Sequence, residues 1–424
     1  MAIARRSSSV RDAVCSKETT DERELVPTVV PGYLRFSLAL SRSSRQLIVV
    51  KLYIIAGESS GDGHAAVLMS ELLAMAPDIE FYGAGGTKMR EVGGSHIFDW
   101  TQEAVVGLWD VLMKYPYFRE QFYRIYREII ELQPSAVIFV DYPGFNLRLA
   151  RYLHRKGFRG KKIYYISPQV WAWNRGRIPK MSRFLDLMLC IFPFEKPLYE
   201  ASGLHTEFVG HPMLAHLETR RISVNREPKL VGLLPGSRER EVRRILSPML
   251  AAAALLKQRD AELRFEVSAA SAKMTDLIER IATTCGFIGL PMSVGNASSL
   301  MQRAAVGMVA SGTATMEASF FRFPFVLIYK VSWLTFIPGR LLVRVQHLGM
   351  PNILAGRTMI PEFIQHEARP EAIADAVWEL YSNETSRVSM IKGMDEVILQ
   401  LTEVAAGHRG AEVILRELGA PVLK

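Results

Sequence analysis

The chain alternates short apolar runs with longer amphipathic stretches, and this pattern occurs twice along its length. Helical patterns over 65–75, 109–132 and 147–156 separate the first set of runs, and a helix through Lys257 opens the second half. The apolar runs cover 47–57, 80–86, 135–141, 161–167, 186–192, 229–237, 263–270, 305–312 and 323–331. Strands that alternate with helices indicate parallel βαβ units, so we predict an α/β fold of two doubly wound domains.

A charged stretch from Arg220 to Lys229 separates the two sets of strands. We therefore predict a first domain over 47–220 and a second domain over 221–384, with helices from about 385 to 424 packing back on the first. Ligands of such sheets bind at the carboxyl ends of the strands, and we expect a cleft between the domains. Nucleotide-sugar transferases and some binding proteins share this architecture, so it does not by itself decide the function.

Residues 1–46 are rich in Ser and Arg and lack sustained periodicity. They contain no apolar core of a signal peptide, and five acidic residues argue against an organellar transit peptide. We expect a disordered extension; a docking or targeting role is the alternative.

The charge balance restricts the partners. The chain has 52 Lys and Arg against 43 Asp and Glu, a net charge of +9. Such an excess favours anionic partners, which include nucleic acid, an anionic lipid surface and phosphorylated substrates. The best candidate for a membrane span, 320–343, contains three basic residues and two prolines, so we reject it.

The Cys and His residues give no sign of a metal site or a disulfide framework. The three cysteines, Cys15, Cys190 and Cys285, are scattered, which fits a reducing cytoplasm. No DxD is present, and the histidines lack the spacing of metal ligands. We expect neither a metal nor a cofactor.

Two turns in the first half follow strongly apolar strands. The first contains Glu58, Ser60, Gly61 and Asp62 at the start of a helix, where free N–H groups suit an anionic group and Glu58 suits a ligand hydroxyl. The second contains Asp141, whose position at a strand end suits a general base. The alternatives are a purely structural turn for the first, and a helix cap or a partner of Arg for Asp141.

A loop over 167–181 concentrates Trp171 and Trp173 with three basic residues. Indoles beside guanidinium groups suit a phosphosugar, a membrane interface or nucleic-acid bases. Alternatively, the tryptophans fill the core beside a solvated basic helix.

Two further turns occur in the second half. Gly236, Ser237 and Arg238 follow a strand; Ser237 is a natural N-cap, and the planar fork of Arg238 matches a diphosphate. This turn lacks the Walker spacing, so ATP hydrolysis is not indicated.

The other turn, over Ser311, Gly312 and Thr313, again offers N–H groups to a phosphate, and Glu317 one helical turn later suits a ribose diol. Asn352 and Arg357 are weaker candidates for the cleft. Each of these turns could instead be structural.

A run over 105–115 carries large apolar side chains and few charges. These are Val105, Leu108, Trp109, Val111 and Leu112. If exposed, they would form an interfacial membrane contact; an ordinary core helix is the alternative.

Nine motifs together resemble the lipid A disaccharide synthase family. They are GESSGD, VVGLWDVL, DYPGFN, SPQVWAW, FPFEKPLYE, FVGHPML, LLPGSREREV, SGTATMEA and PNILAGR, in this order over about residues 47–420. The resemblance implies a GT-B fold and an inverting glycosyltransferase. Its expected substrates are UDP-2,3-diacylglucosamine and 2,3-diacylglucosamine 1-phosphate (lipid X), and its products are UDP and the β-1′,6-linked disaccharide 1-phosphate of lipid A biosynthesis.

The resemblance also implies residue roles. It makes Asp141 the base, Arg238 a catalytic and donor-binding residue, and Asn352 a donor-binding residue. We also expect Asn146, which lies in the same motif as Asp141, near the acceptor or the cleft. The family's DAPDFN motif has a second Asp where this chain has Gly144, so a helper carboxylate is missing there.

We further expect peripheral association with phospholipid on the cytoplasmic face of the inner membrane. A homodimer is possible, and we expect no nucleic-acid partner. The alternatives are another GT-B UDP-sugar enzyme with a different acceptor, and a basic protein that binds nucleic acid or lipid.

Overall fold

The computed structural model describes residues 50–100, 115–332, 336, 345–402 and 406–420. These described residues all belong to one compact unit. The extension 1–46 and the apolar run that contains Val105, Leu108, Trp109, Val111 and Leu112 lie outside the described residues. The predictions made for them therefore stay predictions.

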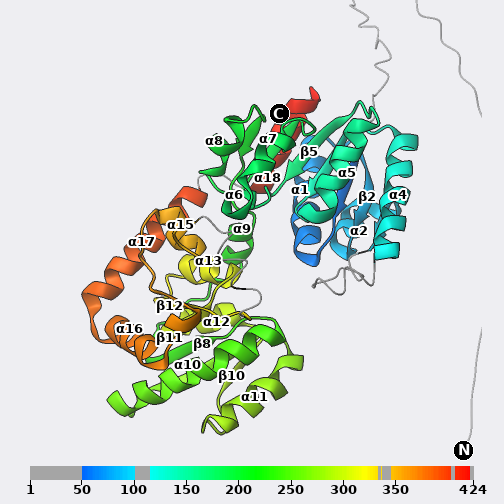
Figure 1. The fold of residues 1–424 in the computed structure, drawn as a ribbon. Coiled ribbons are helices and arrows are strands. Elements are labelled where there is room, and N and C mark those ends of the chain that lie inside the picture. The colour runs from blue at the N-terminus through cyan, green and yellow to red at the C-terminus, as the bar shows by residue number, and fades with distance from the viewer. Residues whose placement is uncertain (1–49, 101–114, 333–335, 337–344, 403–405, 421–424) are drawn as a thin grey trace, which may run out of the picture. The chain divides into compact units, whose positions relative to one another are not determined.

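The first sheet has seven parallel strands in the order β3-β2-β1-β4-β5-β6-β7 (Figure 1). The strands are β1 (Val50–Ala56), β2 (Ile79–Gly85), β3 (Ile97–Asp99), β4 (Ala136–Val140), β5 (Lys161–Tyr165), β6 (Leu187–Cys190) and β7 (Thr206–Phe208). The helices of this half are α1 (Ser59–Met75), α2 (Thr87–Gly93), α4 (Tyr115–Leu132), α5 (Pro143–Arg155), α6 (Val170–Trp173), α7 (Ile178–Met181), α8 (Glu195–Glu200) and α9 (Met213–Glu218).

The second sheet has six parallel strands in the order β10-β9-β8-β11-β12-β13. The strands are β8 (Glu227–Leu234), β9 (Arg264–Ala269), β10 (Met292–Val294), β11 (Ala304–Ala310), β12 (Phe325–Tyr329) and β13 (Glu362–Ile364). The helices are α10 (Glu239–Arg259), α11 (Thr275–Thr284), α12 (Ala297–Arg303), α13 (Thr313–Phe320), α15 (Met350–Ala355), α16 (Pro370–Ser382), α17 (Glu384–Thr402) and α18 (Ala406–Leu418).

The central strands are apolar because helices cover both faces of a parallel sheet. Every residue of β4 is buried, as are the last five residues of β1. On one face, Leu68 of α1 and Ile414 of α18 belong to the same core. On the other face, α4, α5 and α7 contribute to a second core through Ile125, Leu149 and Ile178.

The predicted α/β fold with two doubly wound parallel sheets is confirmed. The four strands that the sequence analysis missed are β3, β7, β10 and β13, the edge strands of the two sheets. Each has only three residues, so none produces a long apolar run. The helical pattern over 65–75 covered only the later part of α1, which begins at Ser59, within the turn that was expected to start a helix.

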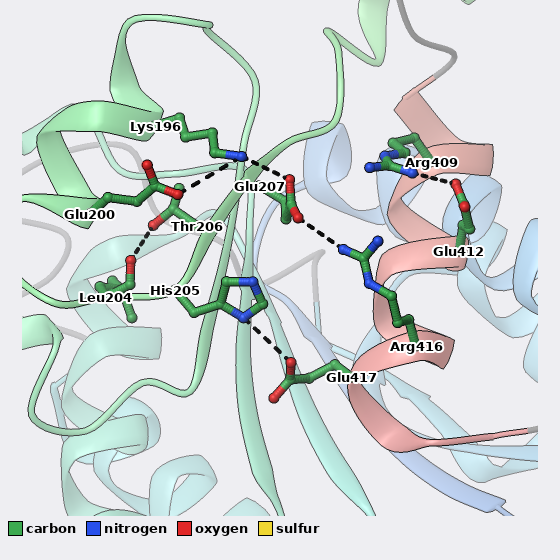
Figure 2. Close-up of polar contacts among 10 residues, drawn as sticks. All are labelled: Lys196, Glu200, Leu204, His205, Thr206, Glu207, Arg409, Glu412, Arg416 and Glu417. Atoms are coloured by element: carbon green, nitrogen blue, oxygen red, sulfur yellow. Dashed lines mark hydrogen bonds and ion pairs between the residues drawn. The ribbon is translucent and has the colours of Figure 1, made fainter.

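The last two helices pack on different partners. Helix α17 contacts α13, α15 and α16, whereas α18 contacts α1. Ion pairs also hold α18: Glu417 accepts from Lys161 at 2.7 Å, and Arg416 donates to Glu207 at 2.8 Å. Figure 2 shows Glu207 between Arg416 and Lys196, which approaches it from α8 at 3.1 Å. The domain boundaries themselves stay predictions.

Candidate functional site

Asp141 lies directly after β4, in a left-handed backbone conformation that residues other than glycine rarely adopt. Its φ is 46° and that of Tyr142 is 47°. Its backbone carbonyl accepts hydrogen bonds from the Tyr164 hydroxyl at 2.6 Å and from Asn146 Nδ2 at 2.8 Å. Its N–H donates to the carbonyl of Tyr165. These bonds fix the backbone on both sides of the Asp141 side chain.

Burial raises the pKa of the Asp141 carboxyl to about 6, and the negative charge of Glu58 contributes to the rise. Glu58 reaches the same edge because β1 and β4 are neighbours, with Ala56 opposite Val140. A pKa near the working pH suits a general base, because a large fraction is ionised and the base remains strong.

Gly57 makes this edge compact. A Cβ atom at this position would lie 2.2 Å from the Tyr142 ring, so only glycine lets the turn after β1 approach the turn after β4. Trp100 contacts the same edge: its ring packs against Tyr142, and its Nε1 donates to the carbonyl of Ala56 at 2.7 Å. The sequence analysis missed Trp100, which precedes a segment outside the described residues.

The side chain of Asp62 is occupied by the protein itself. It is buried and accepts from the backbone N–H groups of Gly86, Lys88 and Met89 at 2.7–3.1 Å. These three bonds satisfy the start of α2 and explain Asp62 without a ligand. Ser60 is exposed in the first turn of α1, and Gly61 is buried there. Contact of these residues with an acceptor stays a prediction.

Trp171 and Trp173 differ in their surroundings. Trp171 is buried, and its Nε1 donates to Glu195 Oε1 at 2.8 Å. Trp173 is exposed, with the Arg177 guanidinium 4.9 Å from its ring centre. Trp171 therefore fills the core, which was the alternative considered for both tryptophans. Of the two, only Trp173 is accessible to a ligand or a surface.

Glu195 is a buried carboxylate to which the sequence analysis gave no role. It accepts from Ser167 at 2.6 Å, from Trp171 and from the backbone of Phe192 at 3.1 Å. Burial raises its pKa to about 7, and these hydrogen bonds oppose the rise. Its position in the FPFEKPLYE motif, after a strand, was the available signal. It anchors the loop that carries both tryptophans.

Seven of the predicted donor-binding residues line one cavity at the carboxyl ends of β8, β9 and β11. The cavity has a volume of ≈ 340 Å³. The seven residues are Gly236, Ser237, Arg238, Ser311, Gly312, Thr313 and Glu317. Ser268 of β9 and Ala297 of α12 also line it and were not predicted. The two glycine turns thus face one space, with the N-terminus of α10 on one side.

Glu241 organises the first of these turns. Its carboxylate accepts from the backbone N–H groups of Ser237 and Arg238, both at 3.3 Å, and its other oxygen lies 3.3 Å from the Arg238 guanidinium. The helix starts at Glu239, and its N-cap is Arg238, so the expectation that Ser237 caps it was wrong. Arg238 is mostly exposed, so its guanidinium can reach a ligand in the cavity.

Glu317 is held within a chain of polar contacts. It accepts from the Ser298 hydroxyl at 2.5 Å, and Ser298 in turn accepts from Arg220 at 3.4 Å. This arrangement fixes the carboxylate at the wall of the cavity, where it can accept hydrogen bonds from a diol.

Asn352 does not line this cavity. It is buried, and its amide makes four hydrogen bonds: it donates to the carbonyl of Ile360 and to Glu362, and accepts from the N–H groups of Met359 and Ile360. These bonds use its donors and its acceptor, so its observed contacts are structural. Arg357 is paired with Glu396 at 2.8 Å on the surface. A donor contact by Asn352 stays a prediction.

Within the described ranges, no group of three or more His, Cys, Asp or Glu side chains could hold a metal ion. In the same part of the chain, no helix is long and apolar enough to cross a membrane.

A family model and the related sequences compared here agree on one family. Residues 52–413 match the family model described as "Lipid-A-disaccharide synthetase". A lipid-A-disaccharide synthase of Myxococcus xanthus is 36% identical over 380 residues, covering 87% of this chain and 97% of the relative. One of Persephonella marina is 38% identical over 379 residues, with 85% and 96% covered.

The fold is similar to solved UDP-sugar enzymes. The S. aureus MnaA–UDP structure aligns with a TM-score of 0.60 at 11% identity, covering 87% of this chain and 97% of that one. The UDP-GlcNAc 2-epimerase of Neisseria meningitidis bound to UDP-GlcNAc aligns with a TM-score of 0.56 at 10% identity, covering 87% and 99%. At such low identity these likenesses extend to the fold alone.

Proposed function

The chain belongs to the lipid-A-disaccharide synthase family, glycosyltransferases of lipid A biosynthesis, and from this premise we propose its substrates and the roles of its residues. The donor is UDP-2,3-diacylglucosamine, and the acceptor is lipid X. The reaction forms the β-1′,6 bond with inversion and releases UDP. The observation that carries this proposal is the cavity shared by the two glycine turns.

The diphosphate of the donor binds at these turns. The backbone N–H groups of Gly312 and Thr313 and the guanidinium of Arg238 supply the donors, and the start of α10 adds its partial positive charge. Glu317 binds the ribose diol. Arg238 and these N–H groups stabilise the charge that grows on the leaving UDP, a role that bound metal ions fill in other transferases.

Asp141 removes the proton from the 6-hydroxyl of lipid X as that oxygen attacks C1 of the donor sugar from the face opposite UDP. Its raised pKa supports this role, and the hydrogen bonds from Tyr164 and Asn146 keep its backbone in place. Trp173 and the turn after β1 contact the acceptor. Gly144 has no side chain, so Asp141 works without a second carboxylate at that position.

The acyl chains of both substrates require access to a bilayer. We place the protein peripherally on the cytoplasmic face of the inner membrane, with the apolar run 105–115 as one contact and a homodimer as the candidate assembly. The excess of basic residues supports attraction to anionic phospholipid.

The test is product formation in mixed micelles. Purified protein is mixed with UDP-2,3-diacylglucosamine and lipid X, and UDP and the disaccharide 1-phosphate are sought by mass spectrometry. The proposal expects both products from the native chain and a loss of about 10²- to 10⁴-fold in Asp141→Asn.

The matched control is Asp276→Asn, which changes an exposed carboxylate in the first turn of α11 and should leave the rate unchanged. UDP binding by Asp141→Asn, measured by calorimetry, should equal that of the native chain. If the native chain binds UDP but forms no disaccharide, lipid X is rejected as the acceptor. Full activity of Asp141→Asn would reject the base.

A further inference from the structure

One stretch of the first half carries many cations and no acid. Between Asp141 and Asp186 the sequence contains eleven Lys and Arg residues and no Asp or Glu. The whole chain, in contrast, has 52 basic and 43 acidic residues. The local excess of +11 therefore exceeds the net charge of the entire protein, +9.

Most of these cations have no counter-charge among the residues that the structure describes. Lys161 pairs with Glu417 and Lys162 with Asp186, at 2.7 and 2.8 Å. The other nine are exposed and form no ion pair with any residue that the structure describes. They are Arg148, Arg151, Arg155, Lys156, Arg159, Arg175, Arg177, Lys180 and Arg183; we call these nine the basic face.

Four members of the basic face lie in α5 and α7, two helices that cover the same side of the first sheet, and the other five lie in the segments next to these helices. Leu149 and Leu153 of α5 and Ile178 and Met181 of α7 pack into one core, together with residues of α4. The outward sides of α5 and α7 therefore look away from the same face of the sheet. Within α5, Arg148, Arg151 and Arg155 follow the spacing of a single helical stripe.

Exposed aromatic rings accompany the cations. Trp173 is 43% exposed under Arg177, and Tyr123 of α4 is 41% exposed, with Arg119 6.0 Å from its ring centre. Tryptophan and tyrosine are enriched where a protein meets the headgroup region of a bilayer. Helix α4 itself adds three Arg and three Glu to this side, so it does not change the charge balance.

We propose that the basic face binds the surface of a bilayer that contains anionic phospholipid. Charge complementarity is the main argument, because each Lys or Arg near an anionic surface contributes about 1 kcal/mol of attraction. Helix α5 begins two residues after Asp141, so the same surface borders the edge where the proposed acylated acceptor reacts. In this respect the inference rests on the proposed function, which it extends by assigning the contact surface.

A bilayer fits this face better than nucleic acid does. Single-stranded nucleic acid binds to aromatic rings whose faces are free for stacking. The ring of Tyr152, which lies within the α5 stripe, packs edge to face against Phe122, Tyr123 and Tyr126. Tyr152 therefore has no free ring face on which a base could stack, and the Arg177 guanidinium lies over the exposed ring of Trp173.

The test measures binding to vesicles without any substrate. The full chain is sedimented with vesicles of phosphatidylglycerol and phosphatidylethanolamine, or of phosphatidylcholine alone, at low and high salt. We expect binding to the anionic vesicles only, and its loss at high salt because salt screens the charges. The triple variant Arg148→Gln, Arg151→Gln, Arg155→Gln should bind about 100-fold more weakly.

A matched triple variant controls for total charge. Lys257→Gln, Lys273→Gln, Arg280→Gln removes three exposed cations from the second half and should bind as the native chain does. Equal weakening of both triple variants would overturn the proposal, as would salt-independent binding to neutral vesicles. The proposal would also be overturned if the native chain bound an RNA oligonucleotide more tightly than vesicles, and if the α5 variant lost the RNA binding but kept the vesicle binding.

Activity separates this proposal from the proposed function. In neutral detergent micelles the α5 variant should release UDP at the native rate, because none of its three exposed side chains is among the residues proposed to bind the substrates or to act in catalysis. Failure of the native chain to form disaccharide would reject the reaction and leave the vesicle result standing. Failure to bind vesicles, with disaccharide still formed, would reject the basic face alone.

Discussion

Asn146 Nδ2 donates a 2.8 Å hydrogen bond to the backbone carbonyl of Asp141 and a 3.2 Å bond to that of Val140. The amide is fully buried at the start of α5, and it holds the end of β4 in the left-handed turn that presents the Asp141 carboxylate. The prediction that Asn146 lies near the acceptor or the cleft stays a prediction; its observed contacts hold the backbone of this turn.

Asn146→Ala should therefore lower kcat more than it raises KM, because the turn loses its hold on the carboxylate. Two buried carbonyls would also lose a donor, which should cost about 1–3 kcal/mol in the free energy of unfolding. Steady-state kinetics and urea denaturation check both effects. Asn174→Ala, at a partly exposed amide in the loop after α6, is the control and should change neither.

Asp141→Asn should make the protein more stable at pH 7. The pKa of the carboxyl is about 6 in the folded protein, against an ordinary value of 3.8, so ionisation opposes folding as the pH rises through this window. Removing the charge should add on the order of 2 kcal/mol at pH 7 and nothing below pH about 3.8. Thermal unfolding at the two pH values measures this; equal stability gains at both would contradict the buried charge as the cause.

Gly236→Ala should weaken UDP binding through the backbone. Gly236 has a φ of 106°, and a Cβ there would lie 2.6 Å from Glu241 Oε2, so the carboxylate that holds the turn would be displaced. We expect the affinity for UDP to fall about tenfold or more, which corresponds to the loss of one charge-assisted hydrogen bond. Calorimetric titration with UDP tests this. Gly289→Ala, also at positive φ but outside the cavity, should leave the affinity unchanged.

Arg238→Lys should also weaken UDP binding, because a lysine cannot make the planar two-pronged contact with a diphosphate. The expected loss is about 10-fold to 100-fold, with no loss of stability, since the side chain is mostly exposed. The neighbouring exposed Arg240→Lys is the control. If both variants bind UDP equally well, the diphosphate does not contact Arg238.

Asp62→Ala should act on stability rather than on the donor. The variant leaves three N–H groups at the start of α2 without their acceptor, which should cost about 2–4 kcal/mol. The affinity for UDP should not change, because Asp62 lies in α1, next to the first sheet, and does not line the cavity proposed for the donor. Asp78→Ala, at an exposed carboxylate before β2, should leave stability unchanged. A stable Asp62→Ala variant would show that the three bonds contribute little.

The sequence predicted the interior strands of both sheets because buried parallel strands are continuous apolar runs. It also predicted that glycine turns around Gly236 and Gly312 follow two of these strands, and both turns line one cavity. It could not predict the edge strands β3, β7, β10 and β13, which are three residues long and half buried.

The sequence could not separate binding residues from structural ones. Asn352 and Asp62 are polar residues in motifs, and only their hydrogen-bond partners reveal that each is occupied by nearby backbone groups. Glu195 and Glu241 were not predicted. Each holds a loop through a hydrogen bond, and the spacing of residues along the sequence does not show such a contact.

The central claim, that Asp141 is the general base, is tested most directly by the pH dependence of kcat/KM. Only the ionised carboxylate can accept a proton, so the rate should fall tenfold per pH unit below about 6 and level off above it. The Asp141→Asn variant should keep only a small residual kcat/KM, and this residual value should not change with pH around 6. A native profile that stays flat through pH 6, or a variant that keeps both the rate and the inflection, would contradict the assignment.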